Sequence, residues 1–163
     1  MSAKIEGRMK SIFYVATIVS AYRKAIDAYY ADPENYEFNP EWMKELKKVS
    51  HREFTTGFYF DKPTNKDQNY QTSAYTRDYY FTGLVKDYDP ETGYAVVERR
   101  NKMNIGDEIE VFGPYTDHYV QTLTEMYDLE TGEPVESAPH PQQMLRIKLD
   151  KPVKADFMLR KKR

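Results

Sequence analysis

Residues 79–112, YYFTGLVKDYDPETGYAVVERRNKMNIGDEIEVF, predict successive β-strands joined by tight turns. The segment 79–88 alternates apolar and polar side chains, as a half-buried strand does. The next five residues, 89–93, are Asp-Pro-Glu-Thr-Gly, in which Pro presets one turn position and Gly adopts the left-handed one. We therefore expect the segment 94–100 to return as the partner strand of a hairpin.

Further strands are predicted on the C-terminal side of this hairpin. They alternate in polarity or are rich in β-branched and aromatic residues, and they run from Glu108 to Phe112, Tyr119 to Tyr127, Met144 to Leu149 and Ala155 to Leu159. Six or more short antiparallel strands favour a small closed barrel, because closure removes the exposed edges that an open sheet must protect. The 15 tyrosines and 8 phenylalanines favour the same class.

The region 79–163 resembles the second domain of translation factors such as elongation factor Tu. Gly83-Leu84-Val85 is similar to a Gly-x-Val strand of that domain, and 106–111, Gly-Asp-Glu-Ile-Glu-Val, is similar to its Gly-Asp/Glu-x-Ile/Val-x-Ile/Val strand. The resemblance implies architecture alone, because one fold hosts many functions. The expected fold class is mostly β with N-terminal α-helices: a small antiparallel, translation-factor-like β-barrel preceded by two helices.

The two helices are predicted from apolar spacing and capping residues. The first runs from about Ser11 to Tyr30, and the second begins at Asn39-Pro40 and ends near Val49. Both sides of the first helix are rather apolar, so we expect it to pack on two sides. Its main apolar stripe consists of Ile12, Val15, Val19, Tyr22, Ile26 and Tyr29.

The chain of 163 residues is expected to contain three parts. Residues 1–50 form a helical segment, 51–78 an aromatic and polar connection, and 79–163 the barrel. No apolar run approaches the roughly 20 residues needed to cross a bilayer, and no signal peptide opens the sequence. We therefore expect a cytoplasmic protein without membrane contact.

Basic residues near aromatic rings are the candidate binding residues. Charge is nearly balanced overall, with 24 basic and 26 acidic side chains, so any contact with RNA must be local. Cations beside aromatic faces are typical of such contacts. Solvated helix ends and strand edges explain the same pattern, as they do for the basic tail at 160–163. The candidate substrate-binding residues are Lys47, Lys48, His51, Arg52, Arg99, Arg100 and Lys102.

No catalytic residue and no metal ligand is predicted in this chain. The motif Asp-x-Glu-Thr-Gly occurs at 89–93 and 128–132, and we interpret both copies as hairpin turns, because Glu precedes each Thr-Gly where aspartic peptidases have Asp. The three histidines are far apart in sequence and lack the spacing of zinc ligands. With no cysteine, the chain offers no thiolate for catalysis or for an iron–sulfur cluster.

Two segments resemble a known family, the collagenase-like peptidases of unknown catalytic type. The first is 4–27, KIEGRMKSIFYVATIVSAYRKAID, and the second is 51–60, where a His-Arg pair precedes Thr-Thr-Gly and three aromatic residues. In that family, the first segment ends the catalytic domain and leads into a C-terminal extension. The resemblance implies that 1–50 contains the end of a catalytic domain whose remainder lies upstream of this chain.

The resemblance also implies what the parent protein does. Family members have collagenase-like peptidase activity, and closely similar proteins act in the hydroxylation of RNA bases, including the wobble uridine of tRNA, with a cysteine-bound iron–sulfur cluster in the catalytic domain. We expect this chain to be a non-catalytic accessory domain that contacts its own upstream catalytic domain and helps to bind or orient a macromolecular substrate such as tRNA. The alternatives are part of a genuine protease acting on collagen-like or other proteins, and a structural or dimerisation module that self-associates through the first helix.

Overall fold

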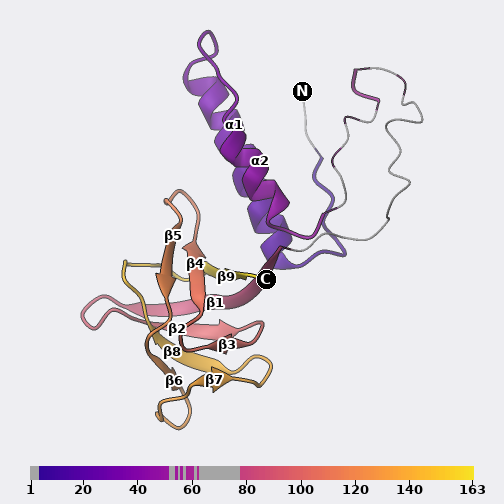
Figure 1. Cartoon of the computed structure of the whole chain (residues 1–163). Helices are drawn as coiled ribbons and strands as arrows, with labels where there is room; N and C mark the ends of the chain where they lie inside the picture. The colour runs from indigo at the N-terminus through magenta and orange to yellow at the C-terminus, as the bar shows by residue number, and fades with distance from the viewer. Residues whose placement is uncertain (1–3, 52–53, 55, 57, 61, 63–77) are drawn as a thin grey trace. The chain divides into compact units, whose positions relative to one another are not determined.

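The computed structural model describes residues 4–51, 54, 56, 58–60, 62 and 78–163. The chain divides into two compact units, Met1–Asp78 and Tyr79–Arg163, and each is described by itself (Figure 1). The expected fold class is confirmed, because two helices precede a β-rich unit. Within the described segments, no helix combines the length and the apolar composition that a membrane span requires.

The first unit contains a pair of helices that pack against each other. α1 (Ile12–Ala31) begins after Ser11, whose side-chain oxygen accepts a hydrogen bond from a backbone N–H of the first turn at 3.3 Å. α2 (Pro40–Lys47) begins after Asn39, which accepts a backbone N–H in the same way at 2.9 Å. Both caps satisfy donors that the helix itself leaves unpaired, so the predicted helix starts are confirmed.

Of the two sides of α1 that were expected to pack, only one is buried among the described residues. The buried positions, Phe13, Thr17, Ile18 and Ala21, lie off the predicted stripe. The stripe itself is between 37% and 48% exposed at Ile12, Val15, Val19, Tyr22 and Tyr29. The spacing of apolar residues could not show which side of α1 is buried, because both sides carry apolar residues. The stripe is therefore an apolar surface of the helical unit rather than its core.

The second unit is a curled antiparallel sheet (Figure 1). Seven strands form it in the order β5-β4-β9-β1-β2-β8-β6, and β3 pairs with β7 separately. It curls into a half-barrel and not into the closed barrel that was expected, because within the described residues its edge strands β5 and β6 do not pair with each other. The strands are β1 (Tyr79–Asp89), β2 (Tyr94–Arg99), β3 (Met103–Asn104), β4 (Glu108–Phe112), β5 (Tyr119–Thr122), β6 (Met126–Asp128), β7 (Ser137–Ala138), β8 (Met144–Lys148) and β9 (Met158–Lys162).

The long strand β1 contributes to the curl of the sheet. It pairs with β2 on one side and β9 on the other, and the register shifts once in each pairing, at Lys86 against β2 and at Thr82 against β9. Bulges of this kind bend a strand and increase its twist. The inner face holds a core of side chains that are completely or almost completely buried, including Val85, Val97, Ile109, Val111, Leu123, Leu145, Ile147 and Leu159.

Two predicted strands have different bounds in the structure. The strand expected over 119–127 is two strands, β5 and β6, which lie at opposite edges of the sheet. They separate at Leu123, whose backbone bonds to Gly106 and Asp107 instead of continuing the β4–β5 ladder. The last strand starts at 158 rather than 155 and extends to 162, so most of the predicted solvated tail belongs to β9.

Candidate functional site

The first group of predicted binding residues lies at the C-terminal end of α2. Lys47 is exposed, whereas Lys48 forms an ion pair with Glu45 of the preceding turn at 2.5 Å. His51 stacks on an aromatic ring at 5.0 Å between centroids, and its Nδ1 donates to a backbone carbonyl at 2.8 Å. Arg52 lies outside the described residues. Contacts with neighbouring residues therefore engage the side chains of Lys48 and His51, whereas Lys47 is an exposed surface cation.

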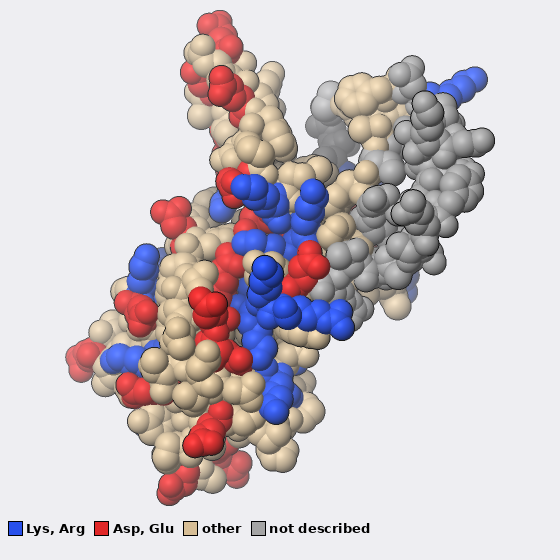
Figure 2. All heavy atoms as spheres, in the orientation of Figure 1, with Lys and Arg blue, Asp and Glu red and all other residues tan. Residues whose placement is uncertain are grey.

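The second group lies at the end of β2 and just beyond it. Arg99 is only 9% exposed, because it continues the inward-facing alternation of the strand. Arg100 forms an ion pair with Glu98 at 2.9 Å, and Lys102 is exposed. Figure 2 shows Lys and Arg side chains gathered in a band that has Asp and Glu side chains along its sides. The two predicted groups belong to different units of the chain.

Arg160 was expected in a solvated tail, and that expectation is wrong. Its side chain is completely buried in β9, where Nε and Nη2 donate to the two carboxylate oxygens of Glu110 on β4 at 2.9 and 2.8 Å. Its guanidinium also lies 4.4 Å from the centroid of the Phe112 ring. The next residue, Lys161, pairs with Asp107 at 2.6 Å. These two ion pairs connect β9 to β4 and to the turn before it, and β9 lies in the interior of the sheet between β4 and β1.

A basic and aromatic surface that was not predicted from the sequence lies on the outer face of β2, β8 and β6. The register places Tyr94 opposite Lys148 and Tyr127 opposite Arg146. The Arg146 guanidinium lies 5.1 Å from the Tyr94 ring centroid and 4.9 Å from that of Tyr127, and Lys148 Nζ lies 4.9 Å from Tyr94. We call these four residues the tyrosine–arginine face. Alternation with the buried Leu145 and Ile147 is the sequence signal that marks Arg146 and Lys148 as outward-facing.

Neither cation of the tyrosine–arginine face forms an ion pair within the described part of the chain. Lys148 Nζ donates to the backbone carbonyl of Thr92, and Arg146 is exposed above the two rings. Lys48, Arg100 and Arg160, by contrast, each have a carboxylate partner. The charge of Arg146 and Lys148 is therefore more available to an external anion than that of the ion-paired residues.

Glu125 fixes the orientation of the two tyrosines. Its Oε2 accepts hydrogen bonds from the hydroxyls of Tyr94 and, at 3.4 Å, Tyr127, and the rings meet edge to face at 6.0 Å. The hydrogen bond to Glu125 raises the pKa of Tyr94 to about 12, because the protonated hydroxyl is the donor in this bond. With their hydroxyls committed to Glu125, the tyrosines offer aromatic surface rather than hydrogen-bond donors.

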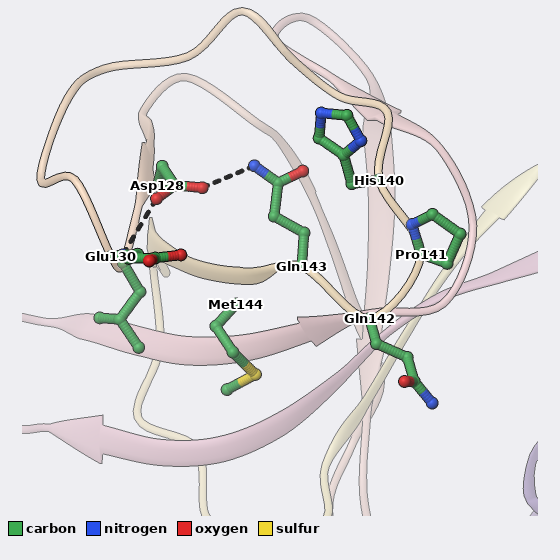
Figure 3. A pocket seen from close by; sticks show the side chains of 8 residues that line it. Asp128, Glu130, His140, Pro141, Gln142, Gln143 and Met144 are labelled. Carbon is green, nitrogen blue, oxygen red and sulfur yellow. Dashed lines mark hydrogen bonds between the residues drawn. The ribbon is translucent and has the colours of Figure 1, made fainter.

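A cavity of about 550 Å³ adjoins this face, between the turn after β6 and the loop before β8 (Figure 3). Met144 lines the cavity and lies two residues from Arg146 in β8, so both side chains belong to the same outer face of the sheet. The cavity and the tyrosine–arginine face are thus neighbours. The other lining residues are Asp128, Leu129, Glu130, His140, Pro141, Gln142 and Gln143.

Asp128 fixes the orientation of the Gln143 amide in this cavity. Gln143 Nε2 donates to Asp128 Oδ2 at 2.7 Å, and because a carboxylate can only accept, the nitrogen must lie at this end. Gln143 Oε1 points to the other side, toward His140 in Figure 3, and it is buried without a hydrogen-bond partner among the described residues. Such a buried acceptor costs about 1–3 kcal/mol unless a donor is supplied to it.

Both copies of the Asp-x-Glu-Thr-Gly motif are turns, as predicted. Asp128 Oδ1 accepts two backbone N–H groups of the turn after β6, both at 3.0 Å, and Gly132 has φ +75°. Asp89 accepts the equivalent pair after β1 at 2.9 and 3.4 Å, and Gly93 has φ +73°. The positive φ explains the glycine at the end of each motif. The carboxylates of Asp89 and Asp128 therefore stabilise the turns in which they lie.

These hydrogen bonds make the stability of the barrel dependent on pH. The Gln143 amide, followed by the turn N–H groups, holds the pKa of Asp128 below its ordinary value. A depressed folded pKa means that the stabilisation is present above the unfolded pKa, about 3.9, and is lost as the pH falls through the folded value. We expect Asp128→Asn to lower Tm at pH 7 and to lower it less at about pH 2.5, in melts followed by circular dichroism. Asp117→Asn, at an exposed position, is the control, and an equal Tm difference at both pH values would contradict the assignment.

Two family models match the sequence. The model of the peptidase family U32 C-terminal domain matches residues 77–160, and the model of peptidase family U32 matches residues 1–69. The first alone covers more than half of the chain. This chain belongs to peptidase family U32. The two matched regions meet close to the division between the helical and barrel units, and the region that the peptidase family U32 model matches, 1–69, includes both helices.

The relatives of this U32 chain have names of two kinds. It is 44% identical to tRNA hydroxylation protein P1 of Bacillus subtilis over 98% of the chain, and 33% identical to Collagenase of Porphyromonas gingivalis over 80% of the chain. The chain spans only 38% and 32% of the lengths of these relatives. A solved C-terminal domain of a Geobacillus thermoleovorans putative U32 peptidase is 40% identical, covering 50% of this chain and 99% of that one, with a TM-score of 0.48.

Proposed function

We propose that this chain is a non-catalytic accessory region of a U32 protein and that it helps to bind or orient tRNA for a catalytic part upstream. The observation that carries the proposal is the 44% identity, over 98% of the chain, to a relative named for tRNA hydroxylation. The match of the barrel unit to the family's C-terminal domain, rather than to the model of the family proper, supports the accessory role.

The surface chemistry of the barrel supports a binding role. The tyrosine–arginine face combines aromatic rings with cations that lack ion-pair partners among the described residues, which suits a ligand that carries both bases and phosphates. The chain has no cysteine, so it does not offer the thiolate ligands of an iron–sulfur cluster. We propose that any such cluster of the parent lies in its catalytic part. We propose a cytoplasmic location on the same ground, because tRNA is a cytoplasmic substrate.

The proposal is tested by titrating labelled tRNA with the chain and following fluorescence anisotropy. We expect a Kd in the micromolar range at low salt that weakens steeply at moderate salt, because phosphate contacts release counterions. A DNA duplex of similar length is the control for binding by charge alone. Absence of tRNA binding at both salt concentrations, together with full activity of a U32 protein truncated at the position that corresponds to His51, would contradict the proposal.

A second candidate function is peptide hydrolysis, which the 33% identity to a relative named Collagenase favours. The chain alone is then expected to cleave gelatin or casein. Cleavage that disappears when one Asp or Ser is replaced would establish this alternative. The carboxylates of Asp89 and Asp128 weigh against it, because both accept hydrogen bonds from the turns in which they lie.

The exposed stripe of α1 supports a contact between this chain and the upstream part of a U32 protein. α1 lies within the region matched by the U32 model, and its stripe presents several large apolar side chains to solvent. Contiguous apolar surface of this kind marks an interaction site. Self-association of the chain through the same stripe is the third candidate function. Light scattering at several concentrations distinguishes it, because only self-association raises the mass with concentration.

A further inference from the structure

We propose that the tyrosine–arginine face and the adjoining cavity together bind an unpaired segment of RNA. One base stacks on the exposed side of the Arg146 guanidinium, and the next base enters the cavity that adjoins it. This inference rests on the proposed function and goes further, because it names the surface and the form of RNA that the surface accepts.

The stacking platform is built from three planar groups. Arg146 is exposed, and its guanidinium lies 5.1 and 4.9 Å from the ring centroids of Tyr94 and Tyr127. Its exposed side can receive a base, because guanidinium planes and aromatic rings both stack bases. The pairing of β6 with β8 and the hydrogen bonds to Glu125 hold the platform in place before any ligand arrives. Preorganisation of this kind lowers the entropic cost of binding.

The cations of the platform are positioned for the phosphates on either side of a stacked base. Arg146 and Lys148 project from the same face of β8, two residues apart, and neither forms an ion pair among the described residues. Lys148 is held in place by its bond to the Thr92 carbonyl. An ammonium keeps donors for a phosphate oxygen after one such bond, because it has three.

The cavity suits a base rather than a phosphate. Asp128 and Glu130 line it, and their carboxylates repel an anion. The rest of the lining is uncharged or apolar and includes Pro141 and Met144, on which a base can pack. A base of a duplex is paired and stacked, so only an unpaired base can turn out into the cavity. The site is therefore expected to accept single strands and loops and to reject duplex.

The same observations favour RNA over a proline-rich, collagen-like peptide. Aromatic grooves do bind such peptides, but the carbonyl groups of the peptide then need hydrogen-bond donors from the groove. The hydroxyls of Tyr94 and Tyr127 are committed to Glu125 and are not available for this. The strongest donors of the face are cations, which match phosphates better than neutral carbonyls.

The test uses the full chain and a fluorescein-labelled single-stranded RNA hexanucleotide, alone and in a duplex with its complement. We expect the wild-type chain to bind the single strand at least about fivefold more tightly than the duplex, because the duplex hides the base edges. Arg146→Ala and Tyr127→Leu are each expected to raise the Kd for the single strand about tenfold. Arg146→Lys is expected to lose most of this affinity while retaining the salt dependence, because a lysine keeps the charge but not the plane.

The matched control is Lys154→Ala, which removes one exposed positive charge from the loop before β9 and is expected to change the Kd less than about twofold. Circular dichroism melts verify that each variant is folded, and amide chemical shifts are expected to change at β6 and β8 on addition of the hexanucleotide.

If the wild type binds tRNA but Arg146→Ala and Tyr127→Leu bind it equally well, this inference is overturned and the proposed function stands. If the wild type binds no tRNA, both fail. Binding of a Gly-Pro-Pro repeat peptide at β6 and β8 in place of RNA would also overturn the inference.

Discussion

Replacing Arg160 by Met is expected to lower the free energy of unfolding of the barrel unit by about 3–5 kcal/mol. The reason is the buried carboxylate that the substitution leaves behind. Arg160 is completely buried and donates twice to Glu110, whose side chain is only 11% exposed. Without the guanidinium, that carboxylate loses its bidentate partner in an environment where water does not replace it. Because β9 pairs with β1 on one side and β4 on the other, the loss affects the middle of the sheet.

Urea denaturation followed by far-ultraviolet circular dichroism measures this effect. The single tryptophan, Trp42, lies in the helical unit, so its fluorescence reports separately whether that unit is altered. Lys162→Met, at an exposed position of the same strand, is the matched control and is expected to change stability by less than about 0.5 kcal/mol. The double variant Arg160→Met, Glu110→Leu is expected to regain most of the loss, because a buried ion pair exchanges for apolar contacts at little net cost. A double variant as unstable as Arg160→Met would contradict this explanation.

Val19→Asp is the second substitution expected to have a large effect, and its effect depends on context. Val19 is 46% exposed in this chain, so the aspartate remains hydrated and stability changes by about 0.5 kcal/mol at most. In a chimaera that carries this chain in place of the matching region of Bacillus subtilis tRNA hydroxylation protein P1, we propose that the α1 stripe is covered by the upstream part. The buried carboxylate is then expected to destabilise the chimaera by about 3 kcal/mol.

Thermal melts of the chain and of the chimaera, each with and without the substitution, measure this difference. Tyr30→Asp serves as the control, because Tyr30 lies on α1 outside the stripe and is 75% exposed. It is expected to leave both proteins unchanged. Equal effects of Val19→Asp in the chain and in the chimaera would show that the stripe does not contact the upstream part.

Local signals in the sequence were sufficient to predict the helix starts and the turns. Ser11 and Asn39 cap their helices with their own side chains, and both Asp-x-Glu-Thr-Gly motifs form turns through the Asp carboxylate and the Gly backbone. These contacts lie within four residues, so the sequence contains everything that determines them. The division of 119–127 into β5 and β6 depends on pairing with distant strands, and no local pattern contains that information.

The candidate site could be predicted only in part, for the same reason. Alternation in β8 marks Arg146 and Lys148 as outward-facing. The tyrosines reach them only through the pairing of β8 with β2 and β6, and Glu125 bonds to a tyrosine 31 positions earlier in the chain. Arg160 was misplaced because a basic run at the end of a sequence is usually solvated, whereas here Glu110 provides a partner 50 positions away.

A single side-chain amide connects the edge strand β5 to the end of β8. Gln121 donates from Nε2 to the carbonyl of Lys148 and accepts from the N–H of Asp150, both at 3.0 Å. This is the donor and acceptor pattern that a peptide group would offer in a β-ladder, so the Gln121 side chain joins the two sides of the half-barrel across its open side. The Gln121 side chain bonds to the backbone of Lys148, whose side chain belongs to the tyrosine–arginine face. Loss of these two hydrogen bonds would therefore move the backbone of Lys148, so the curvature of the sheet and the geometry of the proposed RNA surface depend on the same residue.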